Sequence, residues 1–294
     1  MSARLRKAVF PVAGLGTRLL PATRAVPKEL LPVVDRPAIQ YGVDEAAAAG
    51  IEEFIFVTSP EKGAIRDHFT PAPALEAELE TKGRTEELER LRACIPAGAR
   101  FAWTFQEQAL GLGHAVGCAR DLVGDEPFAV ILPDDLVLSR TPCLAQMVAA
   151  REERGGGSLV AVMDVPREQT SRYGILDTGA DDGRLAEIVG LVEKPAPEDA
   201  PSTLSIIGRY ILDPAIFGHL SAGRPGAGGE IQLTDAMAAM IGTMPFNGLR
   251  FEGTRFDCGN PLGLMEANIA FALSRQEFVD GMRDILRRHE IGGN

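Results

Sequence analysis

Short apolar runs alternate with amphipathic segments along most of this 294-residue chain. The runs have the length of buried strands, and helical spacing of apolar positions marks several segments between them. Strands are predicted at residues 8–10, 54–58, 100–106, 128–132, 158–165, 206–212 and 247–251, with a hairpin at 173–177 and 184–192. Helices are predicted at 38–49, 116–122, 143–154 and 230–241. This β-loop-α-β rhythm predicts an α/β fold with a parallel or mixed sheet covered by helices.

Three segments depart from this rhythm. Residues 74–94 are rich in Glu around Gly83 and predict two short charged helices, interpreted as a solvated insertion rather than a partner surface. The tail 261–290 keeps helical periodicity, with apolar positions that would pack on the domain or on another subunit. Residues 224–229 predict a flexible loop. Because no linker or repeat is visible, we expect a single domain over residues 1–294.

A glycine turn follows the first predicted strand. Gly14 and Gly16 break that strand, and glycine lets a backbone approach a ligand closely. Successive amide groups in such a turn form a concavity that binds anions. Thr17 adds a hydroxyl, Arg18 a charged fork suited to phosphate, and Lys28 a second, compact cation. The simplest ligand for this arrangement is a polyphosphate.

The glycine turn is a weak signal when taken alone, because an ordinary strand-to-helix turn can carry the same residues. It is not the dinucleotide-binding pattern G-x-G-x-x-G, since Leu19 occupies the position of the third glycine. This spacing disfavours a NAD-dependent oxidoreductase. It is not a P-loop either, because no Gly-Lys-Ser/Thr follows.

Composition narrows the expected partners. The formal charge is −11, so nucleic acid is not an expected partner, and a polyphosphate would need a local cationic pocket. Only 5 of the 30 cations are Lys, which suggests that Lys28 and Lys194 supply point charges where a planar fork is not wanted. The 4 cysteines lack C-x-x-C spacing, which disfavours zinc and disulfides and suits a reduced cytoplasm. No apolar stretch is long enough to suggest a membrane partner.

Acidic residues stand at the ends of predicted strands. Asp134 and Asp135 follow one strand, and Asp257 lies at the end of another. In open α/β sheets, ligands bind outside the carboxyl ends of the strands. Two carboxylates from separate strand ends can hold one Mg²⁺ beside substrate phosphates. An isolated Asp after a strand is more often a cap or turn residue, but a polyphosphate site favours the metal.

Other polar positions are further candidates. Glu193 and Lys194 end a strand and could bind sugar hydroxyls and a phosphate, or form a surface ion pair. Gly174 could let a sugar approach the backbone, or mark a bulge. Gln106 could read a pyrimidine edge, because an amide both donates and accepts, or be an ordinary strand residue. His114 is interpreted as structural, since no Ser or Cys nucleophile is arranged with it.

Seven segments carry a family resemblance when taken in order along nearly the whole chain. They are the glycine turn with Pro27-Lys28-Glu29, Gln106 with Gly111–Val116, Leu132–Asp135, Glu193–Pro195, Ile207–Tyr210, Gly229–Ala236 and Phe256–Gly259. Together they resemble the motifs of UTP–glucose-1-phosphate uridylyltransferases, a branch of the sugar-1-phosphate nucleotidylyltransferases. The resemblance implies a Rossmann-like nucleotidyltransferase fold with a mixed, mostly parallel sheet. It also implies C-terminal helices at the interface of a homodimer or homotetramer.

The resemblance implies transfer of a uridylyl group from UTP to glucose 1-phosphate, giving UDP-glucose and pyrophosphate. A sugar phosphate is already an anionic nucleophile, so direct attack on the α-phosphorus requires only alignment and charge neutralisation. By this resemblance Arg18 and Lys28 would serve catalysis, and Asp134 and Asp257 would bind Mg²⁺. Glucose 1-phosphate would be bound by Gly174, Glu193 and Lys194. The nucleotide would be bound by Ala13, Gly14, Gln106 and Gly111, beside Gly16 and Thr17 of the turn.

Two alternatives stay open from the sequence. The same chemistry could use another pair of substrates, with dTTP or ATP in place of UTP. A non-catalytic regulatory homologue belongs to a different functional class, but it would be expected to lose Arg18, Lys28 or an Asp, and this chain keeps all of them.

Overall fold

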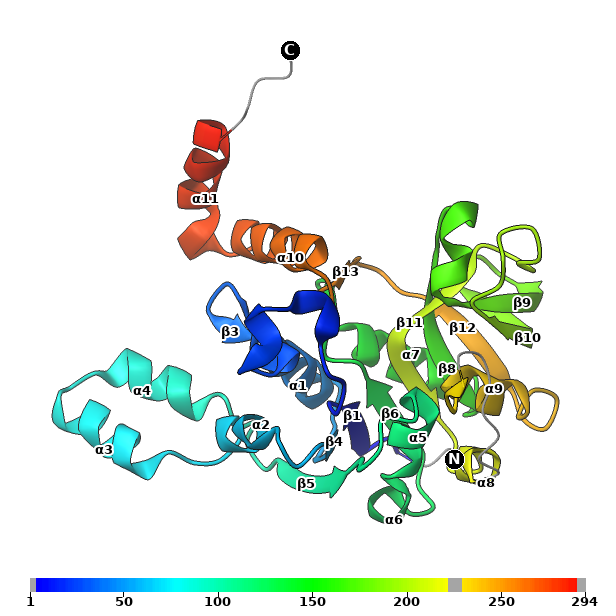
Figure 1. The fold of residues 1–294 in the computed structure, drawn as a ribbon, viewed down its shortest axis with the longest axis horizontal. Helices are drawn as coiled ribbons and strands as arrows, with labels where there is room; N and C mark the ends of the chain where they lie inside the picture. The colour runs from blue at the N-terminus through cyan, green and yellow to red at the C-terminus, as the bar shows by residue number, and fades with distance from the viewer. Residues whose placement is uncertain (1–3, 222–228, 290–294) are drawn as a thin grey trace.

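The computed structural model describes residues 4–221 and 229–289, which are built around a nine-stranded sheet (Figure 1). In spatial order the strands are β5 (Arg100–Phe105), β4 (Glu53–Thr58), β1 (Lys7–Pro11), β6 (Phe128–Ile131), β11 (Leu204–Leu212), β8 (Ser158–Asp164), β12 (Phe246–Arg250), β10 (Leu185–Glu193) and β9 (Gly174–Asp181). Of these nine strands, only β11 and β10 run against the others. The expected mixed, mostly parallel sheet is confirmed.

Helices cover both faces of the sheet, because successive strand side chains point to opposite sides. Val9 belongs to one apolar cluster and its neighbour Phe10 to the other. The cluster of Val9 is covered by α5 (Leu112–Gly117), α6 (Arg120–Val123), α8 (Ile216–Leu220) and α9 (Leu233–Ala238). The cluster of Phe10 is covered by α1 (Ala38–Ala48), α2 (Gly63–His68) and α7 (Cys143–Glu153).

Two pairs of helices stand out from this layered body in Figure 1. The first is α3 (Pro73–Thr81) with α4 (Thr85–Arg92), the two charged helices expected from the Glu-rich segment, in which only Leu88 is buried. The second is α10 (Pro261–Leu273) with α11 (Gln276–His289). Helix α10 packs Phe271 against Phe256 in a third apolar cluster. None of the described helices could cross a membrane.

The structure corrects two of the expected helices, those predicted at residues 116–122 and 230–241, which both lie near the loop at residues 110–113. The amide of Gly113 donates to the carbonyl of Ile231 at 2.8 Å, and the amide of Ile231 donates to Leu110 at 2.7 Å. Because these tertiary hydrogen bonds occupy the backbone around residue 231, α9 begins only at Leu233. The helix predicted at 116–122 divides into α5 and α6 near Gly117, a weak helix former. The loop predicted at 224–229 lies, apart from Gly229, outside the described residues.

Several small elements shape the edge of the sheet where the predicted site lies. An antiparallel pair that the hydrophobic pattern did not reveal joins β7 (Asp135–Leu138) to β13 (Thr254–Asp257). A second pair joins β2 (Pro32–Val33) to β3 (Arg36–Pro37), and short 3₁₀ helices cover Thr17–Leu19, Ala22–Arg24, Lys28–Leu30 and Arg167–Arg172. Strand β1 lies between β4 and β6, so the loop at its carboxyl end occupies the point where strand order reverses. Ligands bind at such points in α/β sheets.

Candidate active site

The glycine turn leaves β1 as an exposed loop. Gly16 has φ 66°, a left-handed conformation that glycine adopts without strain, and it caps the 3₁₀ helix that contains Arg18. The hydroxyl of Thr23 donates to the Gly16 carbonyl at 2.8 Å and fixes the far side of the turn. Among the described residues, none accepts a hydrogen bond from the amides of residues 14–18. These amides are therefore available to a ligand, and their binding of an anion stays a prediction.

Lys62, which sequence analysis missed, holds the loop from beneath. Its ammonium donates to the carbonyls of Val12 and Gly14, each at 2.6 Å, and to the Glu29 carboxylate at 2.9 Å. A trans peptide points its C=O and the following N–H in opposite directions. With these two carbonyls turned toward Lys62, the amides that follow them point away from it. The scarcity of lysine, applied to position 62 as to 28 and 194, is the signal that could have found this residue.

Lys28 and Asp134 form a tight, largely buried pair. Lys28 Nζ lies 2.5 Å from Asp134 Oδ2, and both side chains are less than one-fifth exposed. Burial alone would lower the pKa of Lys28, but the charges of Asp134 and Glu29 outweigh it and raise that pKa. Burial opposes ionisation of Asp134, yet the charge and hydrogen bond of Lys28 hold its pKa below the ordinary value. Both groups are therefore charged at neutral pH.

Asp134 and Asp257 meet across the β7–β13 pair, although they are far apart in the sequence. The register places Asp257 opposite Asp135, and the Cys258 amide donates to the Asp134 carbonyl at 2.7 Å. A Cβ built on Gly259 would lie 2.9 Å from Asp134 Oδ2 and 3.0 Å from Asp257 Oδ1. The two carboxylates thus converge on the space above Gly259, as the sequence predicts.

The donor set over Gly259 fits a divalent cation that shares its coordination with substrate. No group of three or more metal-binding side chains occurs within residues 4–221 and 229–289. Mg²⁺ needs only one or two protein carboxylates when phosphates and water complete its octahedron. Arg18 Nη1, 3.6 Å from Asp257 Oδ2, places a cation beside the same carboxylates. These residues would therefore fit a metal shared with bound anions better than a metal held by protein alone.

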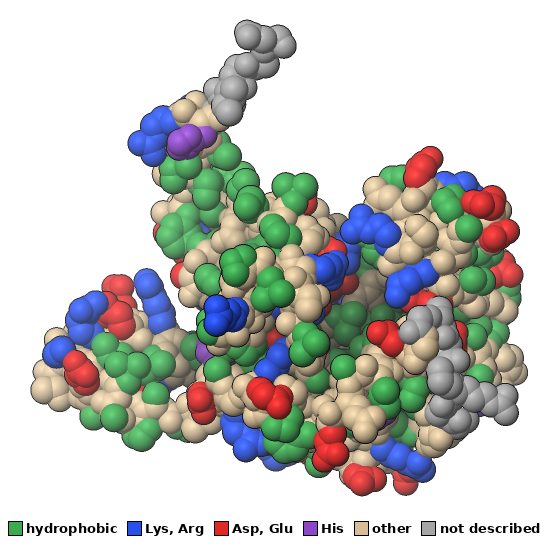
Figure 2. Space-filling model, in the orientation of Figure 1, with side chains coloured by type: hydrophobic (Ala, Val, Ile, Leu, Met, Phe, Trp, Pro, Cys, Tyr) green, Lys and Arg blue, Asp and Glu red, His purple; other side chains and the backbone are tan. Residues whose placement is uncertain are grey.

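A cavity of about 480 Å³ is lined by six of the thirteen predicted site residues. Its wall includes Arg18, Asp134, Gly174, Glu193, Lys194 and Asp257. Figure 2 shows a hollow between the central body and the lobe of β9 and β10, with basic side chains around its rim. The other predicted residues, Ala13, Gly14, Gly16, Thr17, Lys28, Gln106 and Gly111, do not line this cavity. Arg18, next to Thr17, and Leu112, next to Gly111, connect the two groups.

The cavity wall near β9 and β10 has a fixed geometry. Glu193 Oε2 accepts a hydrogen bond from Thr234 at 2.7 Å, and its Oε1 lies 3.2 Å from Lys194 Nζ. A Cβ on Gly174 would lie 3.2 Å from both Glu193 Oε2 and the Thr234 hydroxyl, so glycine keeps this corner open. Lys194 has φ 49°, which is uncommon for a residue with a side chain. Such strain concentrates at functional sites.

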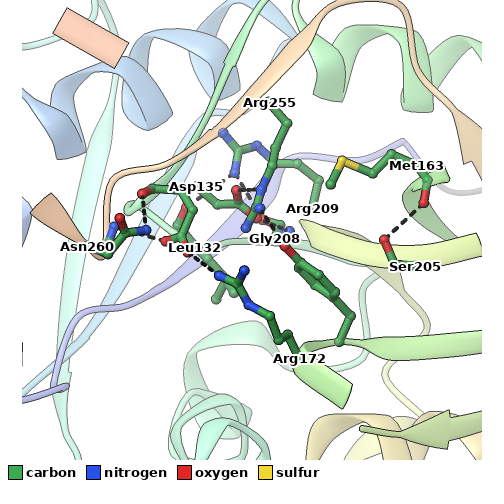
Figure 3. Close-up of polar contacts among 12 residues, drawn as sticks. Leu132, Asp135, Met163, Arg172, Ser205, Gly208, Arg209, Arg255 and Asn260 are labelled. Carbon is green, nitrogen blue, oxygen red and sulfur yellow. Dashed lines mark hydrogen bonds and ion pairs between the residues drawn. The ribbon is translucent and has the colours of Figure 1, made fainter. Parts of the chain in front are cut away.

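Asp135 does not serve the same purpose as Asp134. It accepts a hydrogen bond from the Gly208 amide at 2.7 Å and pairs closely with Arg255. Arg255 Nη1 also donates to the Tyr173 hydroxyl at 3.3 Å, so this pair supports the residue before Gly174. Figure 3 shows Asp135, Gly208 and Arg255 together, with Arg172 reaching in from the side opposite Arg255.

Two arginines near the site were also missed. Arg172 is 55% exposed, lines the cavity and lies 3.9 Å from Asp257, which makes it a third cation close to the two carboxylates. Its position directly before Tyr173-Gly174 is the signal that could have found it. Arg209 is fully buried, pairs with Glu45 at 2.8 Å and donates to the Leu132 carbonyl at 3.2 Å (Figure 3). It anchors the turn that presents Asp134.

Comparisons with known proteins show which family the chain belongs to. The family model described as nucleotidyl transferase matches residues 7–273. A UTP–glucose-1-phosphate uridylyltransferase of Komagataeibacter xylinus is 52% identical over 258 residues, covering 88% of this chain and 90% of the relative. A UTP-bound UDP-glucose pyrophosphorylase from Acinetobacter baumannii has a TM-score of 0.89 at 38% identity, covering 98% of this chain and 100% of that one.

A second solved structure, a UDP-glucose pyrophosphorylase complexed with UDP-glucose, has a TM-score of 0.83 at 40% identity. It covers 92% of this chain and 100% of its own. Family model, sequence relatives and fold therefore agree over most of the chain. The chain belongs to the nucleotidyl transferase family, in the branch of the UTP–glucose-1-phosphate uridylyltransferases.

Proposed function

We propose that this chain transfers a uridylyl group from UTP to α-D-glucose 1-phosphate, giving UDP-glucose and pyrophosphate. The observation that carries the proposal is the convergence of Asp134 and Asp257 above Gly259, in the wall of a cavity that also contains Glu193 and Lys194. This arrangement offers a place for phosphates and, a short distance away, polar groups for a sugar.

The reaction is a direct displacement. A phosphate oxygen of glucose 1-phosphate attacks the α-phosphorus of UTP, and the bond from that phosphorus to the α,β-bridging oxygen breaks. Pyrophosphate leaves with the bond's electron pair. Because one phosphoanhydride replaces another, the reaction runs in both directions. No side chain has to form a covalent intermediate, so the protein contributes alignment and charge.

The two proposed catalytic cations would contact different parts of the UTP phosphates. Arg18, 59% exposed and directed to Asp257, would contact the α- and β-phosphates and the leaving pyrophosphate. Lys28, held charged beside Asp134, would contact the attacked phosphate. Such preorganised charge stabilises the developing negative charge without reorganisation at the moment of reaction.

A divalent cation, Mg²⁺ in our proposal, would be held by Asp134 and Asp257. When bound, it neutralises phosphate charge and draws the two substrates together. The remaining roles follow the two groups of residues around the cavity. Gly174, Glu193 and Lys194 would bind glucose 1-phosphate, and the nucleotide would be bound by Ala13, Gly14, Gly16, Thr17, Gln106 and Gly111.

We also propose a single domain that assembles into a homodimer or homotetramer through α10 and α11. Helix α11 has no buried residue, and the two helices expose apolar side chains, among them Leu262, Met265 and Ile285 at 76%, 61% and 43%. A second copy of the chain would cover these exposed apolar side chains of α10 and α11. The four free cysteines suit a cytoplasmic enzyme.

The test is pyrophosphate release from a matrix of nucleotides and sugar phosphates. We expect turnover with UTP and glucose 1-phosphate to exceed that with dTTP, ATP or galactose 1-phosphate. A preference for dTTP or ATP would move the chain to the same chemistry on another substrate pair. Absence of turnover with every pair, in protein that still binds UTP, would support a regulatory homologue instead.

A further inference from the structure

The side chain of Gln106 is held by two acceptors from the loop and helix that follow it. Gln106 stands directly after β5, is 8% exposed, and its amide N–H donates to the Thr58 carbonyl at 2.8 Å. Its Nε2 lies 3.1 Å from the Gly111 carbonyl oxygen and 3.0 Å from Nδ1 of His114. The position of this amide group is therefore set within the protein.

The Gly111 contact settles which way the Gln106 amide faces. A carbonyl oxygen only accepts hydrogen bonds, so the atom beside it must be the NH₂ group. One hydrogen then goes to Gly111 and the other to His114. His114 Nδ1 must therefore carry a lone pair, which leaves the ring proton on Nε2, facing Cys118 Sγ at 4.0 Å.

This arrangement leaves Oε1 of Gln106 as the free end of the amide. Among the described residues, none donates a hydrogen bond to Oε1. Because every fully buried side-chain oxygen and nitrogen of these residues has a partner, an Oε1 without one must be accessible. Oε1 is therefore open to an incoming group and can only accept from it. A base that meets this oxygen must present an N–H.

We propose that His114 is a positioning residue that fixes the Gln106 amide and so makes the nucleotide site select a base with an imide N–H. The proposal rests on the function proposed above, in which Gln106 meets the base. Uracil carries a hydrogen on N3, which Oε1 accepts. Cytosine has a lone pair on N3, which would face Oε1 without a proton between them. Thymine also has the N3 hydrogen, so this device separates UTP from CTP and not from dTTP.

Without His114 the amide keeps only the Gly111 bond, and turning it over becomes easier. The loss corresponds to one neutral hydrogen bond, which predicts a decrease of roughly threefold to tenfold in the ratio of kcat/KM for UTP to that for CTP. The reaction itself does not involve His114. The change should therefore fall on the KM for UTP, with kcat nearly unchanged.

The experiment compares four single variants and one double variant with the wild-type enzyme in steady-state kinetics with UTP and CTP. His114→Ala should lower the UTP/CTP ratio, and His114→Asn, whose side-chain oxygen can accept where Nδ1 does, should restore most of it. Cys118→Ala, on the other side of the ring, should leave the ratio unchanged. In a Gln106→Leu background, His114→Ala should have no further effect on the ratio, because the amide it positions is gone.

Each other outcome overturns the proposal. An unchanged ratio in His114→Ala, an equal loss on both nucleotides, or failure of His114→Asn to restore the ratio would reduce His114 to a structural residue. Should His114→Ala fail to fold, His114→Leu provides the same comparison with similar volume. Turnover of UTP by the wild-type enzyme tests the proposed function separately, since it does not depend on the ratio.

Discussion

At the scale of single residues, the site depends on side chains that hold one another in place. Lys28 and Asp134 are paired at 2.5 Å, and Arg18 lies 3.6 Å from Asp257. Removing one member therefore changes the charge and the position of its partner. Variants that separate these two effects are the most informative.

Gly259→Ala tests the convergence of the two carboxylates without removing any charge. Its new Cβ would lie 2.9 Å from Asp134 Oδ2 and 3.0 Å from Asp257 Oδ1, and closer still to Arg18 Nη2, so the two carboxylates and the guanidinium must all shift. We expect kcat to fall at least about tenfold, since a displacement of this size disturbs aligned reactants. Gly63→Ala, where nothing lies within 4 Å, is the matched control and should leave kcat unchanged. Equal activity of the two variants would contradict the described convergence.

The pH dependence of the Lys28–Asp134 pair follows from the directions of its pKa shifts. A lowered carboxyl pKa means that Asp134 contributes stability above its ordinary pKa, and that this is lost as pH falls through the lowered value. A raised Lys28 pKa means that charged Lys28 contributes to stability at lower pH, and that this contribution is lost as pH rises through the raised value. From about pH 5 to about pH 9, neither group should titrate in the profile of kcat. A basic limb below pH 9 that disappears in Lys28→Arg would contradict this assignment.

At the scale of elements, the glycine turn is shaped by contacts from the segment before α2. Lys62 joins the Val12 and Gly14 carbonyls to Glu29, which is fully buried next to Lys28. One ammonium group therefore couples the loop that would bind the nucleotide to the turn that carries a proposed catalytic lysine.

Lys62→Met should leave Glu29 buried without its partner and release the loop. We expect a loss of unfolding free energy of about 3 kcal/mol and a rise in the KM for UTP. Adding Glu29→Gln should recover part of the stability, because the uncompensated charge is removed. The exposed Lys82→Met is the control. Thermal unfolding and UTP kinetics measure both effects, and a Lys62→Met protein as stable as the control would refute the coupling.

The elements also show where prediction from sequence succeeds. The main strands are predicted correctly from uniformly apolar runs, because a strand that is buried on both faces is apolar at nearly every position. Strands β7 and β13 are not predicted from the sequence, since each has only four residues and depends on pairing with the other. The helix expected from residue 230 is shorter because the Ile231 backbone is paired with Leu110 and Gly113. Such long-range hydrogen bonds leave no periodic trace in the sequence.

The site residues divide in the same way. Gly14, Arg18, Lys28 and Asp134 belong to motifs that read continuously in the sequence. Lys62, Arg172 and Arg209 receive no role from the sequence, although Arg209 lies in the Ile207–Tyr210 motif, because their contacts with distant segments depend on the fold. The sequence indicates a structural role for His114 because no nucleophile accompanies it, and its contact with Gln106 is the basis of the positioning role proposed above.

At the scale of the whole molecule, two helical pairs project from the sheet (Figure 1). The apolar row of α10 and α11 is exposed to solvent in one chain, whereas α3 and α4 expose mainly charged residues. A hollow of about 890 Å³ between α1, α4 and α11 lies away from the proposed catalytic residues. The C-terminal pair is thus the surface whose burial a second copy would favour.

Light scattering after gel filtration tests this assembly. We expect a dimer or tetramer for the wild-type chain. Met265→Glu and Ile285→Glu together should shift it toward monomer, because charges would replace apolar contact surface. Glu78→Gln on α3, exposed and far along the other projection, is the control. A monomeric wild-type chain at micromolar concentration would contradict the proposed assembly.

The central claim is that Asp134 and Asp257, brought together by the β7–β13 pair, form the charged centre of uridylyl transfer. Its most direct test is UDP-glucose formation by Asp134→Asn and Asp257→Asn across a Mg²⁺ titration, with exposed Asp125→Asn as control. We expect both variants to lose at least about a hundredfold in kcat and to need more Mg²⁺, while the control matches the wild-type enzyme. Near-normal turnover by either variant at ordinary Mg²⁺ concentration would contradict it.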